Sequence, residues 1–410
     1  MKEKIIIKFL LILFFFLSCT DENENIADDK FNINLAHLDY LSETISLDST
    51  DVLIVYIYAE APNYERIEAE GEGITAVDDV ARAALVYLRY YEQFGGEENL
   101  EKAKKALKFV LHMQAEDGQF YNFIYDDHTI NRDGRTSLKS FDYWAIRAIR
   151  AMSYGYKLFI SRDQEFAGQL RNAVEMTFPH IEKWMDSKGQ YILTFPVNIP
   201  LWLINNAGDQ SSELVLGLID FYDATGDDRA QEYIRKLTDG LVKFQISKGE
   251  YSGAHLSWQN LWHAWGAHQV QAIAQAYKLF NDEKWLSSLI SGADFYSKIV
   301  LDGHLNELEF ITADSVIVKK FPQIAYGIHA ITSGLMEAFL VTGDEEYRES
   351  MLSALQWFSG QNAANVVMYD STTGRTFDGI DENGVNRNSG AESTIEALLA
   401  FLEMRENGFL

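Results

Sequence analysis

A pattern of paired helices recurs five times along the chain, at intervals of roughly sixty residues. In each copy, aromatic or apolar residues lead into a short turn and charged residues follow, as in "YYEQFGGEENLEKA", "FYDATGDDRAQEY" and "FLVTGDEEYRES". The turns fall near residues 96, 162, 227, 282 and 344. A fixed period of this length indicates one helical unit repeated in space.

The two helices of each pair differ in composition. The first is apolar around most of its circumference, as in "YWAIRAIRAM", whereas the second has one charged face, as in "RAQEYIRKLTDGLVKF". Helices that are apolar all round are buried, and amphipathic helices have one face in water. The first helices therefore form an inner ring and the second an outer ring, with residues 391–404 as a sixth inner helix. The predicted fold is all-α, an (α/α)6 toroid of six helical hairpins.

Two N-terminal segments lie outside the five repeated hairpins, and their positions relative to the ring must be considered separately. "INLAHLDYLSETI", residues 33–45, is the candidate outer partner of the last inner helix and would close the circle. Residues 50–60, "TDVLIVYIYAE", have the β-branched and aromatic residues typical of a strand. Nothing in the sequence assigns this strand a position.

The chain begins like an exported protein. Lys2, Lys4 and Lys8 accompany the apolar run "FLLILFFFLS", which is shorter than the roughly 20 residues of a membrane span. The run ends at Cys19, the only cysteine, so the chain forms no intramolecular disulfide. "FLSC" resembles the lipobox of bacterial lipoproteins, which implies lipidation of Cys19; a free secreted form is the alternative.

The predicted domain organisation follows. Residues 1–18 form a signal peptide, and residues 19–35 form an acidic, flexible tether that contains "TDENENIADD". Residues 36–410 form a single toroid domain. The resemblance implies an outer-membrane lipoprotein at the cell surface or on the periplasmic face.

The charge balance excludes some partners. The formal net charge of −26 becomes −28 when residues 1–18, with three lysines and one glutamate, are removed. Such a chain is unsuited to nucleic acid or an anionic membrane surface. The sequence has no phosphate-binding glycine loop, dinucleotide fingerprint or nucleophile elbow. His263 and His268 are five residues apart and do not share a helix face as a metal-binding pair would, so we expect no cofactor and no metal.

The connections between hairpins indicate where function lies. They run for roughly 15–30 residues, well above the usual loop median of about 4–6. They contain aromatic residues, Asn, Gly and most of the loop Arg and Lys residues. Every inner helix begins after one of these connections, so the long loops must share one end of the ring. Long loops in compact folds tend to be functional, and we expect the site at the inner-helix N-termini.

From about residue 76 to 404 the chain resembles the six-hairpin glycosidase-like superfamily of (α/α)6 toroids. The resemblance rests on "VDDVARAALVYLRYYE", on the hairpin turns and on "TFDGIDENGVNRNSGAESTIEALLAF". In such families the second inner helix often opens with an acidic-Ser-His-Gly-Arg pattern. Here "SFDYWAIRAIRAM" has Asp142, Trp144 and Arg147 in comparable places and lacks the His. The resemblance implies a toroid that handles sugars, without naming a reaction.

Carboxylates near the inner-helix N-termini are the catalytic candidates. Hydrolysis of a glycosidic bond commonly uses two carboxyl groups, one as acid and one as base or nucleophile. Glu213 lies one turn into its helix, where burial would raise its pKa as a general acid requires. Asp79 or Asp142 is the preferred base.

Helix capping is the competing explanation for several of these acids. Ser389 and Glu392 have the S-x-x-E spacing of a capping box, and Thr75 and Asp78 have the equivalent T-x-x-D spacing. Asp209 is a candidate N-cap of the third inner helix. In the functional interpretation, Asp78 and Glu392 bind sugar hydroxyls instead.

Loop aromatic, histidine and basic residues are further candidates for substrate binding. Aromatic faces stack on sugar rings, although loop packing explains such residues equally well. Histidines can donate to hydroxyls or lie in the core. Clustered arginines suit an anionic, uronate-containing sugar, with simple ion pairing as the alternative. The candidates are Trp202, Trp258, Trp262, His263, His329, Tyr369, Arg135 and Arg387, with Trp258 and Trp262 as the preferred stacking platform.

Three functions therefore fit the sequence. The first is a lipid-anchored enzyme that hydrolyses glycosidic bonds in poly- or oligosaccharides, and a lyase or epimerase acting on uronates would use the same scaffold. The second is a non-catalytic glycan-binding lipoprotein, because a fold does not dictate its function. The third is a scaffold lipoprotein that holds protein partners through its acidic rim.

Overall fold

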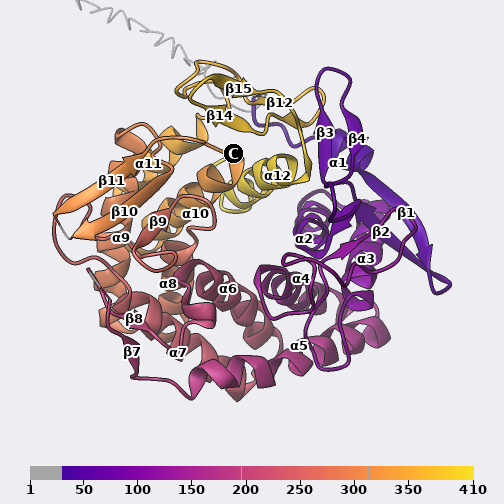
Figure 1. The fold of residues 1–410 in the computed structure, drawn as a ribbon, viewed down its shortest axis with the longest axis horizontal. Helices are drawn as coiled ribbons and strands as arrows, with labels where there is room; N and C mark the ends of the chain where they lie inside the picture. Colours follow the sequence, from indigo (N-terminus) through magenta and orange to yellow (C-terminus); the bar gives the residue numbers. More distant parts are fainter. Residues whose placement is uncertain (1–29, 195, 313) are drawn as a thin grey trace, which may run out of the picture.

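The computed structural model describes residues 30–194, 196–312 and 314–410. Six helices stand side by side in an inner ring, each packed against the next, and the last packs against the first (Figure 1). The prediction of an (α/α)6 toroid is confirmed. The inner helices are α2 (Val77–Phe94), α4 (Tyr143–Phe159), α6 (Gly208–Thr225), α8 (Gln269–Phe280), α10 (Ala325–Thr342) and α12 (Ala391–Glu406).

Five helices form most of the outer ring, and each is paired with the inner helix before it. Four of them begin at an aspartate whose side chain accepts a hydrogen bond from the first turn: Asp163, Asp227, Asp282 and Asp344. These four acidic hairpin turns therefore supply the N-cap residue of the helix that follows. The outer helices are α3 (Glu97–His112), α5 (Gln164–Met185), α7 (Asp228–Lys243), α9 (Glu283–Leu301) and α11 (Glu345–Leu355).

Close packing within the inner ring depends on small residues. A Cβ atom on Gly217 of α6 would lie 2.8 Å from Arg150 Cα of α4, so glycine permits these two helices to approach. The apolar sides of the inner helices are buried against each other and against the outer ring. No described helix is long and apolar enough to cross a membrane.

The sixth hairpin is completed by the N-terminal part, but only partly as predicted. Helix α1 (Ala36–Leu41) packs against α12 and is only six residues long. The rest of the expected outer helix is strand β1 (Ser42–Leu47), which pairs antiparallel with β2 (Thr50–Val55). β2 also packs against α3, so the strand-like segment forms a hairpin on the outside of the ring.

The tether ends earlier than predicted. Phe31 is buried and its ring centroid lies 5.4 Å from that of Phe401 in α12, while Leu35 is also buried. Residues 31–35 therefore belong to the folded domain, because two apolar side chains find a place in its core. The predicted signal peptide, Cys19 and the tether up to residue 29 lie outside the described residues.

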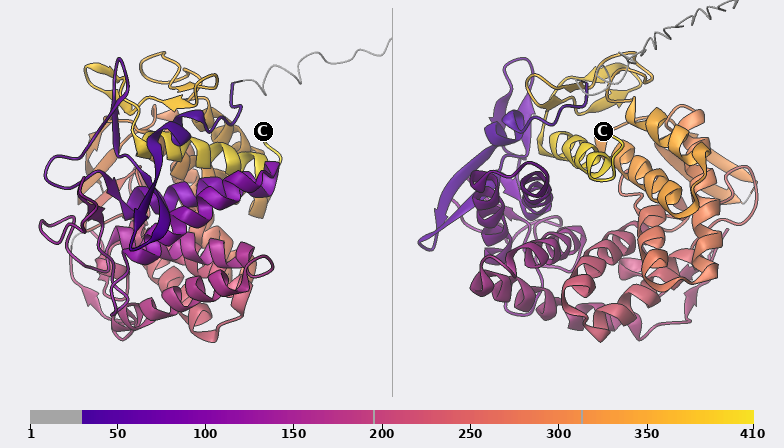
Figure 2. Two further views of the ribbon diagram at one scale, coloured as in Figure 1. Left: turned by 90° about the vertical axis from the view of Figure 1, so that its right-hand side faces the viewer. Right: turned by 180° about the vertical axis from the view of Figure 1, so that it is seen from behind.

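The long connections gather at one end of the ring, where the inner helices begin (Figure 2). They contain the 3-10 helix η1 (Ile204–Asn206) and a three-stranded antiparallel sheet in the order β11-β10-β9. Short two-stranded pairs make up the rest. The strands are β3 (Tyr58–Glu60), β4 (Glu65–Ile67), β5 (Thr75–Ala76), β6 (Phe123–Ile124), β7 (Tyr191–Ile192), β8 (Ile199–Pro200), β9 (Leu261–His263), β10 (Glu307–Thr312), β11 (Ser315–Lys319), β12 (Tyr369–Asp370), β13 (Arg375–Thr376), β14 (Gly379–Asp381) and β15 (Gly384–Asn386).

Candidate active site at the loop end of the ring

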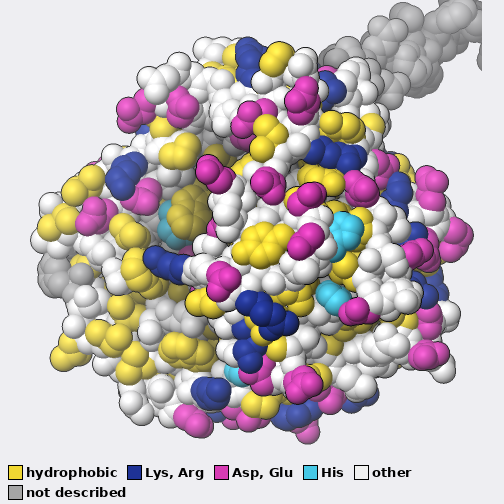
Figure 3. Space-filling model, turned by 45° about the vertical axis from the view of Figure 1, so that its right-hand side comes forward, with side chains coloured by type: hydrophobic (Ala, Val, Ile, Leu, Met, Phe, Trp, Pro, Cys, Tyr) yellow, Lys and Arg dark blue, Asp and Glu magenta, His cyan; other side chains and the backbone are white. Residues whose placement is uncertain are grey.

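Two of the cavities formed by the described residues lie at the starts of inner helices. The first, of about 340 Å³, lies at the starts of α2 and α12; we call it the acidic pocket because Asp78, Asp79, Asp378 and Glu392 line it. The second, of about 510 Å³, lies at the starts of α4 and α6 beside β9. We call it the aromatic pocket, after Tyr143, Trp258 and Trp265 in its wall. Figure 3 shows acidic, basic and hydrophobic side chains interspersed over this part of the surface.

Asp79 is the buried acid of the acidic pocket. It lies in the first turn of α2, is only 6% exposed, and contacts Arg82 Nη2 at 2.8 Å through Oδ1. Burial raises the pKa of Asp79 to about 7. The positive charge of Arg82 opposes this rise, and the negative charges of Asp78 and Glu392 add to it. A carboxyl group with this pKa holds or releases a proton near neutrality, as acid–base catalysis requires.

Glu392 does not form the predicted capping box. The N-cap of α12 is Gly390, without a side-chain cap, and Ser389 Oγ has no hydrogen-bond partner among the described residues. The backbone N–H groups of Ser389 and Ala391 donate instead to carbonyls in and beside β3, and Gly390 N–H donates to Asp378. The Glu392 side chain, 46% exposed, is left facing the acidic pocket 3.4 Å from Arg82.

The other two predicted caps are also wrong. The N-cap of α2 is Ala76, and Thr75 Oγ1 accepts a hydrogen bond from Val55 N–H of β2. The N-cap of α6 is Ala207 rather than Asp209. For Thr75 a tertiary contact replaces the local bond that the spacing indicated, whereas Asp209 accepts a hydrogen bond from the backbone N–H of Gln210 and faces His263.

The aromatic pocket combines a capped carboxylate with an exposed indole. Asp142 is the N-cap of α4 and also accepts a hydrogen bond from Gln210 at 2.9 Å. Both hydrogen bonds end on Oδ1 of this carboxylate. Trp258 is 45% exposed in the pocket wall, and the Trp265 ring stacks on His263 with centroids 3.5 Å apart. The exposed indole of Trp258 is available for stacking on a ligand.

His263 is held by its neighbours. Its Nε2 lies 3.1 Å from Asp209 Oδ2, and its Nδ1 faces the carbonyl of Trp265. Both ring nitrogens are engaged within the protein. The imidazole therefore holds Asp209 and Trp265 in the wall of the aromatic pocket.

Arg147 lies between the two pockets. Its guanidinium pairs with Asp78 of the acidic pocket, and its Cζ lies 5.2 Å from the ring centroid of Tyr143 in the aromatic pocket. The same group lies 4.9 Å from the ring centroid of Tyr326. One buried cation thus contacts a wall residue of each cavity, although it lines neither of them.

Below the pockets the axis of the ring is filled by buried charges. His329 Nδ1 lies 2.6 Å from Glu396 and Nε2 lies 3.4 Å from Glu403. Burial disfavours the charged ring, yet the hydrogen bonds to Glu396 and Glu403 raise the pKa of His329 to about 9. Nδ1 of this predicted binding residue is hydrogen-bonded to Glu396 and Nε2 lies within ion-pair distance of Glu403, so both nitrogens face buried carboxylates and His329 stabilises the axis instead of facing a ligand.

Glu213 also belongs to this axis. It is buried as expected, but its Oε2 lies 2.8 Å from Arg150 Nη1 and 3.8 Å from His268 Nε2. Burial alone would raise the pKa of Glu213; the charge of Arg150, with those of His268 and Arg147, holds it below the usual value. The expected rise is therefore wrong, and the physical basis for Glu213 as general acid is lost.

Several predicted binding residues lie away from both pockets. Trp202 is buried and donates its indole N–H to the Lys236 carbonyl. Trp262 is fully buried against Phe295, so it cannot serve as a stacking platform. Tyr369 is buried and donates to the Asn32 carbonyl.

The basic loop residues do not gather as a group. Arg135 lines the aromatic pocket. Arg387 lies with its Cζ 5.1 Å from the Phe377 ring and lines neither pocket. Lys139 pairs with Asp117 at 2.7 Å and Lys319 pairs with Glu307. Ion pairing thus explains these two lysines, and the uronate hypothesis rests on Arg135.

The main residues that sequence reasoning missed are Arg82, Glu396 and Tyr143. Arg82 contacts Asp78, Asp79, Glu392 and Glu396 and so organises the acidic pocket. A signal was present, because Arg82 and Glu396 are charged residues inside otherwise apolar inner helices. A charge in such a helix must be paired when it is buried.

The described residues contain no group of three or more His, Cys, Asp or Glu side chains arranged to hold a metal ion. The groups that face the two pockets are carboxylates, guanidinium groups, amides and aromatic rings. This set can transfer protons, bind hydroxyl groups and stack on a sugar ring.

Solved structures with the same fold are sugar-processing enzymes by name. A sugar epimerase from a ruminal bacterium matches with a TM-score of 0.66 and 15% identity, over 93% of this chain and 98% of that one. A cellobiose 2-epimerase from Spirochaeta thermophila matches with 0.66 and 13%, over 93% and 96%. A family 76 glycoside hydrolase from a bovine Bacteroides thetaiotaomicron strain matches with 0.57 and 12%, over 92% and 78%. These likenesses show that the chain has the fold of the six-hairpin toroids. No protein-family profile and no curated protein matches its sequence.

Proposed function

We propose that this protein is a carbohydrate-active enzyme that hydrolyses glycosidic bonds, with Asp79 as its general acid. The observation that carries the proposal is the raised pKa of Asp79, about 7, in a pocket that also contains the half-exposed carboxylate of Glu392. Two carboxyl groups in different environments can divide the roles of acid and base. The fold supports this proposal because the similar solved structures are named as sugar epimerases and glycoside hydrolases.

The proposed roles follow from exposure and pairing. Asp79 donates its proton to the glycosidic oxygen as the bond to the anomeric carbon breaks. Glu392 accepts a proton from the water that adds to that carbon, and Asp79 is reprotonated afterwards. Asp78 is held by Arg147 and Arg82 and binds a hydroxyl of the sugar. Asp79, preferred as the base from the sequence, is thus assigned as the acid.

The substrate extends into the aromatic pocket. Trp258 stacks on a second sugar ring, while Arg135 and Gln210 contact its hydroxyls. Because the two pockets lie on either side of Arg147, a ligand that occupies both has at least two sugar units. We therefore assign the substrate to the oligo- and polysaccharides.

A sugar epimerase is the second candidate. The structural match to the named epimerases is better, with a TM-score of 0.66 over 98% of the ruminal protein against 0.57 over 78% of the family 76 hydrolase. In that reaction Asp79, in its ionised form, removes a proton from the carbon next to a carbonyl group, and a proton that has exchanged with solvent is delivered to the other face of that carbon.

One experiment separates these functions. The protein is incubated in D₂O with a panel of oligosaccharides, and the products are analysed for new reducing ends and for deuterium bound to carbon. Hydrolysis gives shorter chains with new reducing ends and no carbon-bound deuterium. An epimerase gives a product of unchanged length that carries deuterium. Binding without either product, in wild type and Asp79→Asn alike, would establish a glycan-binding protein instead.

We also propose that the mature protein is anchored by a lipid on Cys19. The support is the position of this single cysteine directly after an apolar run of signal-peptide length. The test is partition of membrane extracts between detergent and aqueous phases. The wild type should enter the detergent phase and Cys19→Ser the aqueous phase; a wild type that stays aqueous would show a free secreted protein.

A further inference from the structure

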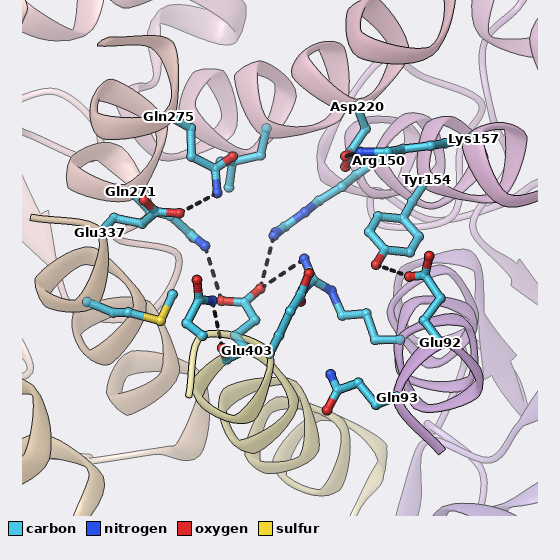
Figure 4. Close-up of a pocket in the computed structure, with 15 residues that line it drawn as sticks. Glu92, Gln93, Arg150, Tyr154, Lys157, Asp220, Gln271, Gln275, Glu337 and Glu403 are labelled. Atoms are coloured by element: carbon cyan, nitrogen blue, oxygen red, sulfur yellow. Dashed lines mark hydrogen bonds and ion pairs between the residues drawn. The ribbon is translucent and has the colours of Figure 1, made fainter. Parts of the chain in front are cut away.

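A third cavity lies at the opposite end of the ring, where the inner helices finish. It has a volume of about 410 Å³, and side chains from all six inner helices reach it (Figure 4). We call it the far pocket. None of the roles assigned to the acidic and aromatic pockets involves it, and the buried charges of the axis lie between the two ends.

The far pocket is negative and polar. Its wall contains five acidic and three basic side chains, together with three amide side chains from glutamines and one from an asparagine. The C-termini of the inner helices also point to this end, and helix C-termini carry partial negative charge. A ligand here meets an excess of negative potential.

Three acceptor oxygens on this wall receive no hydrogen bond within the described residues. They are Gln93 Oε1, Glu337 Oε2 and Glu403 Oε1. Glu337 Oε2 has an ion pair with Lys278, which does not line the pocket. Glu403 is 2% exposed; the nearest cations to its Oε1 are Arg89 at 3.4 Å and Arg150 at 3.7 Å. These oxygens can therefore accept hydrogen bonds from a ligand.

Among the described residues, Asp220 is the one acid of this wall whose carboxylate receives no hydrogen bond. Its nearest cation is Lys157 Nζ at 3.9 Å, and that ammonium group lies closer to Asp223, at 2.7 Å. Burial raises the pKa of Asp220 to about 6, in keeping with a carboxylate that has no close counterion. In Figure 4 its side chain lies beside Lys157, near Arg150 and Tyr154.

We propose that the far pocket binds a small organic compound that carries a primary ammonium group, with Asp220 as its main counterion. The volume falls within the usual range for small-molecule sites, and the described residues offer no cluster that could hold a metal ion. An ammonium group supplies a positive charge for the excess of carboxylates and hydrogen-bond donors for the acceptor oxygens that receive none. Polyamines and amino sugars share this chemistry.

The test is calorimetric titration of the purified protein with glucosamine, N-acetylglucosamine, glucose and spermidine. Glucosamine or spermidine should bind, whereas N-acetylglucosamine and glucose should bind at least about tenfold more weakly because they lack the charge. Binding of glucosamine alone would identify amino sugars, and binding of spermidine alone would identify polyamines. Equal binding of glucosamine and N-acetylglucosamine, or binding of none of the four, would overturn the proposal.

Asp220→Asn and Asp223→Asn form a matched pair of variants. Both remove one carboxylate near Lys157 on the same helix, but only Asp220 lines the far pocket. Asp220→Asn should weaken ammonium binding about tenfold, and Asp223→Asn should not. The comparison matters because an acidic protein attracts cations non-specifically; equal affinities in the two variants would contradict the assignment.

The proposal can fail independently of the proposed function. Asp220 lies at the other end of the ring from Asp79, so Asp220→Asn should leave any turnover of glycans at the loop end unchanged. Loss of ammonium binding with intact turnover supports the far pocket as a separate site. Ammonium binding does not depend on whether any glycan is processed.

Discussion

Arg82 Nη1 lies 2.6 Å from Glu396 Oε1, although 314 residues separate the two in the chain. Both side chains are buried, and they join the first inner helix to the last. Arg82 also pairs with Asp79 in the acidic pocket. The contact that closes the ring therefore also positions the proposed general acid, and fold and site depend on the same guanidinium group.

Turnover should decrease as the pH rises through about 7. A general acid acts in its protonated form, which exists below its pKa, and the pKa of Asp79 is about 7. The measurement is a pH–rate profile for glycan hydrolysis. Asp79→Asn should lower the rate by about 10²- to 10⁴-fold and abolish this limb of the profile. A wild-type rate that is constant across neutral pH would exclude Asp79 as the acid.

Folding stability should decrease between pH 6.5 and about 9 because of His329. Its pKa is raised from 6.5 to about 9 in the folded state, so protonation stabilises the fold fully below 6.5 and is lost as the pH rises through 9. This shift in the pKa of His329 corresponds to a decrease in the free energy of unfolding on the order of 3 kcal/mol across the window. Urea denaturation at pH values on both sides of this window measures it.

Two variants test the assignment to His329. His329→Gln should flatten the decrease in stability with pH, because the titrating group is gone. His304→Gln is the matched control: burial lowers the pKa of His304 to about 4, so this residue does not titrate in the window. Identical pH dependence in wild type and His329→Gln would show that other groups cause the effect.

Glu392→Gln should impair function without destabilising the fold. Glu392 faces the acidic pocket and does not cap α12, so its change in unfolding free energy should stay within about 0.5 kcal/mol. Asp142→Ala provides the contrast, because it removes a true N-cap and should cost about 0.5–2 kcal/mol. Thermal unfolding and glycan turnover of both variants check this. Strong destabilisation of the fold by Glu392→Gln would show that Glu392 has a structural role instead.

Trp258→Ala should weaken binding of oligosaccharides by about 0.5–1.5 kcal/mol, or roughly two- to tenfold. The indole is half exposed in the aromatic pocket and is proposed to stack on a sugar ring. Trp202→Phe should leave binding unchanged, because Trp202 is buried away from both pockets. Affinity measurements with the same oligosaccharide series compare them. Equal loss in both variants would indicate a general effect on the fold.

The hairpin repeat was predictable because its signals are local. Four of the five acidic hairpin turns contain their own side-chain cap, such as Asp227 before α7, and each inner helix has its own apolar surface. The position of the site at the helix starts followed from the length of the connections. These features depend on residues that are close in the chain.

The chemistry of the site was less predictable because it depends on contacts between distant segments. The cap expected at Ser389 is replaced by hydrogen bonds to a strand more than three hundred residues away. Glu213 is buried, as expected, but its pKa depends on Arg150 in a neighbouring helix. Trp258 and Trp262 lie in one loop, and only the fold decides that the first is exposed and the second buried.

The closing contact between α12 and α2 has a consequence for how the chain is made. Helix α12 is synthesised after the other five inner helices, and until it is complete α2 lacks its neighbour on one side. A nascent chain can assemble its hairpins in order, but the carboxylate that pairs with Arg82 is synthesised 314 residues later. Completion of α12, rather than formation of any single earlier hairpin, should therefore be the step at which the ring acquires its native stability.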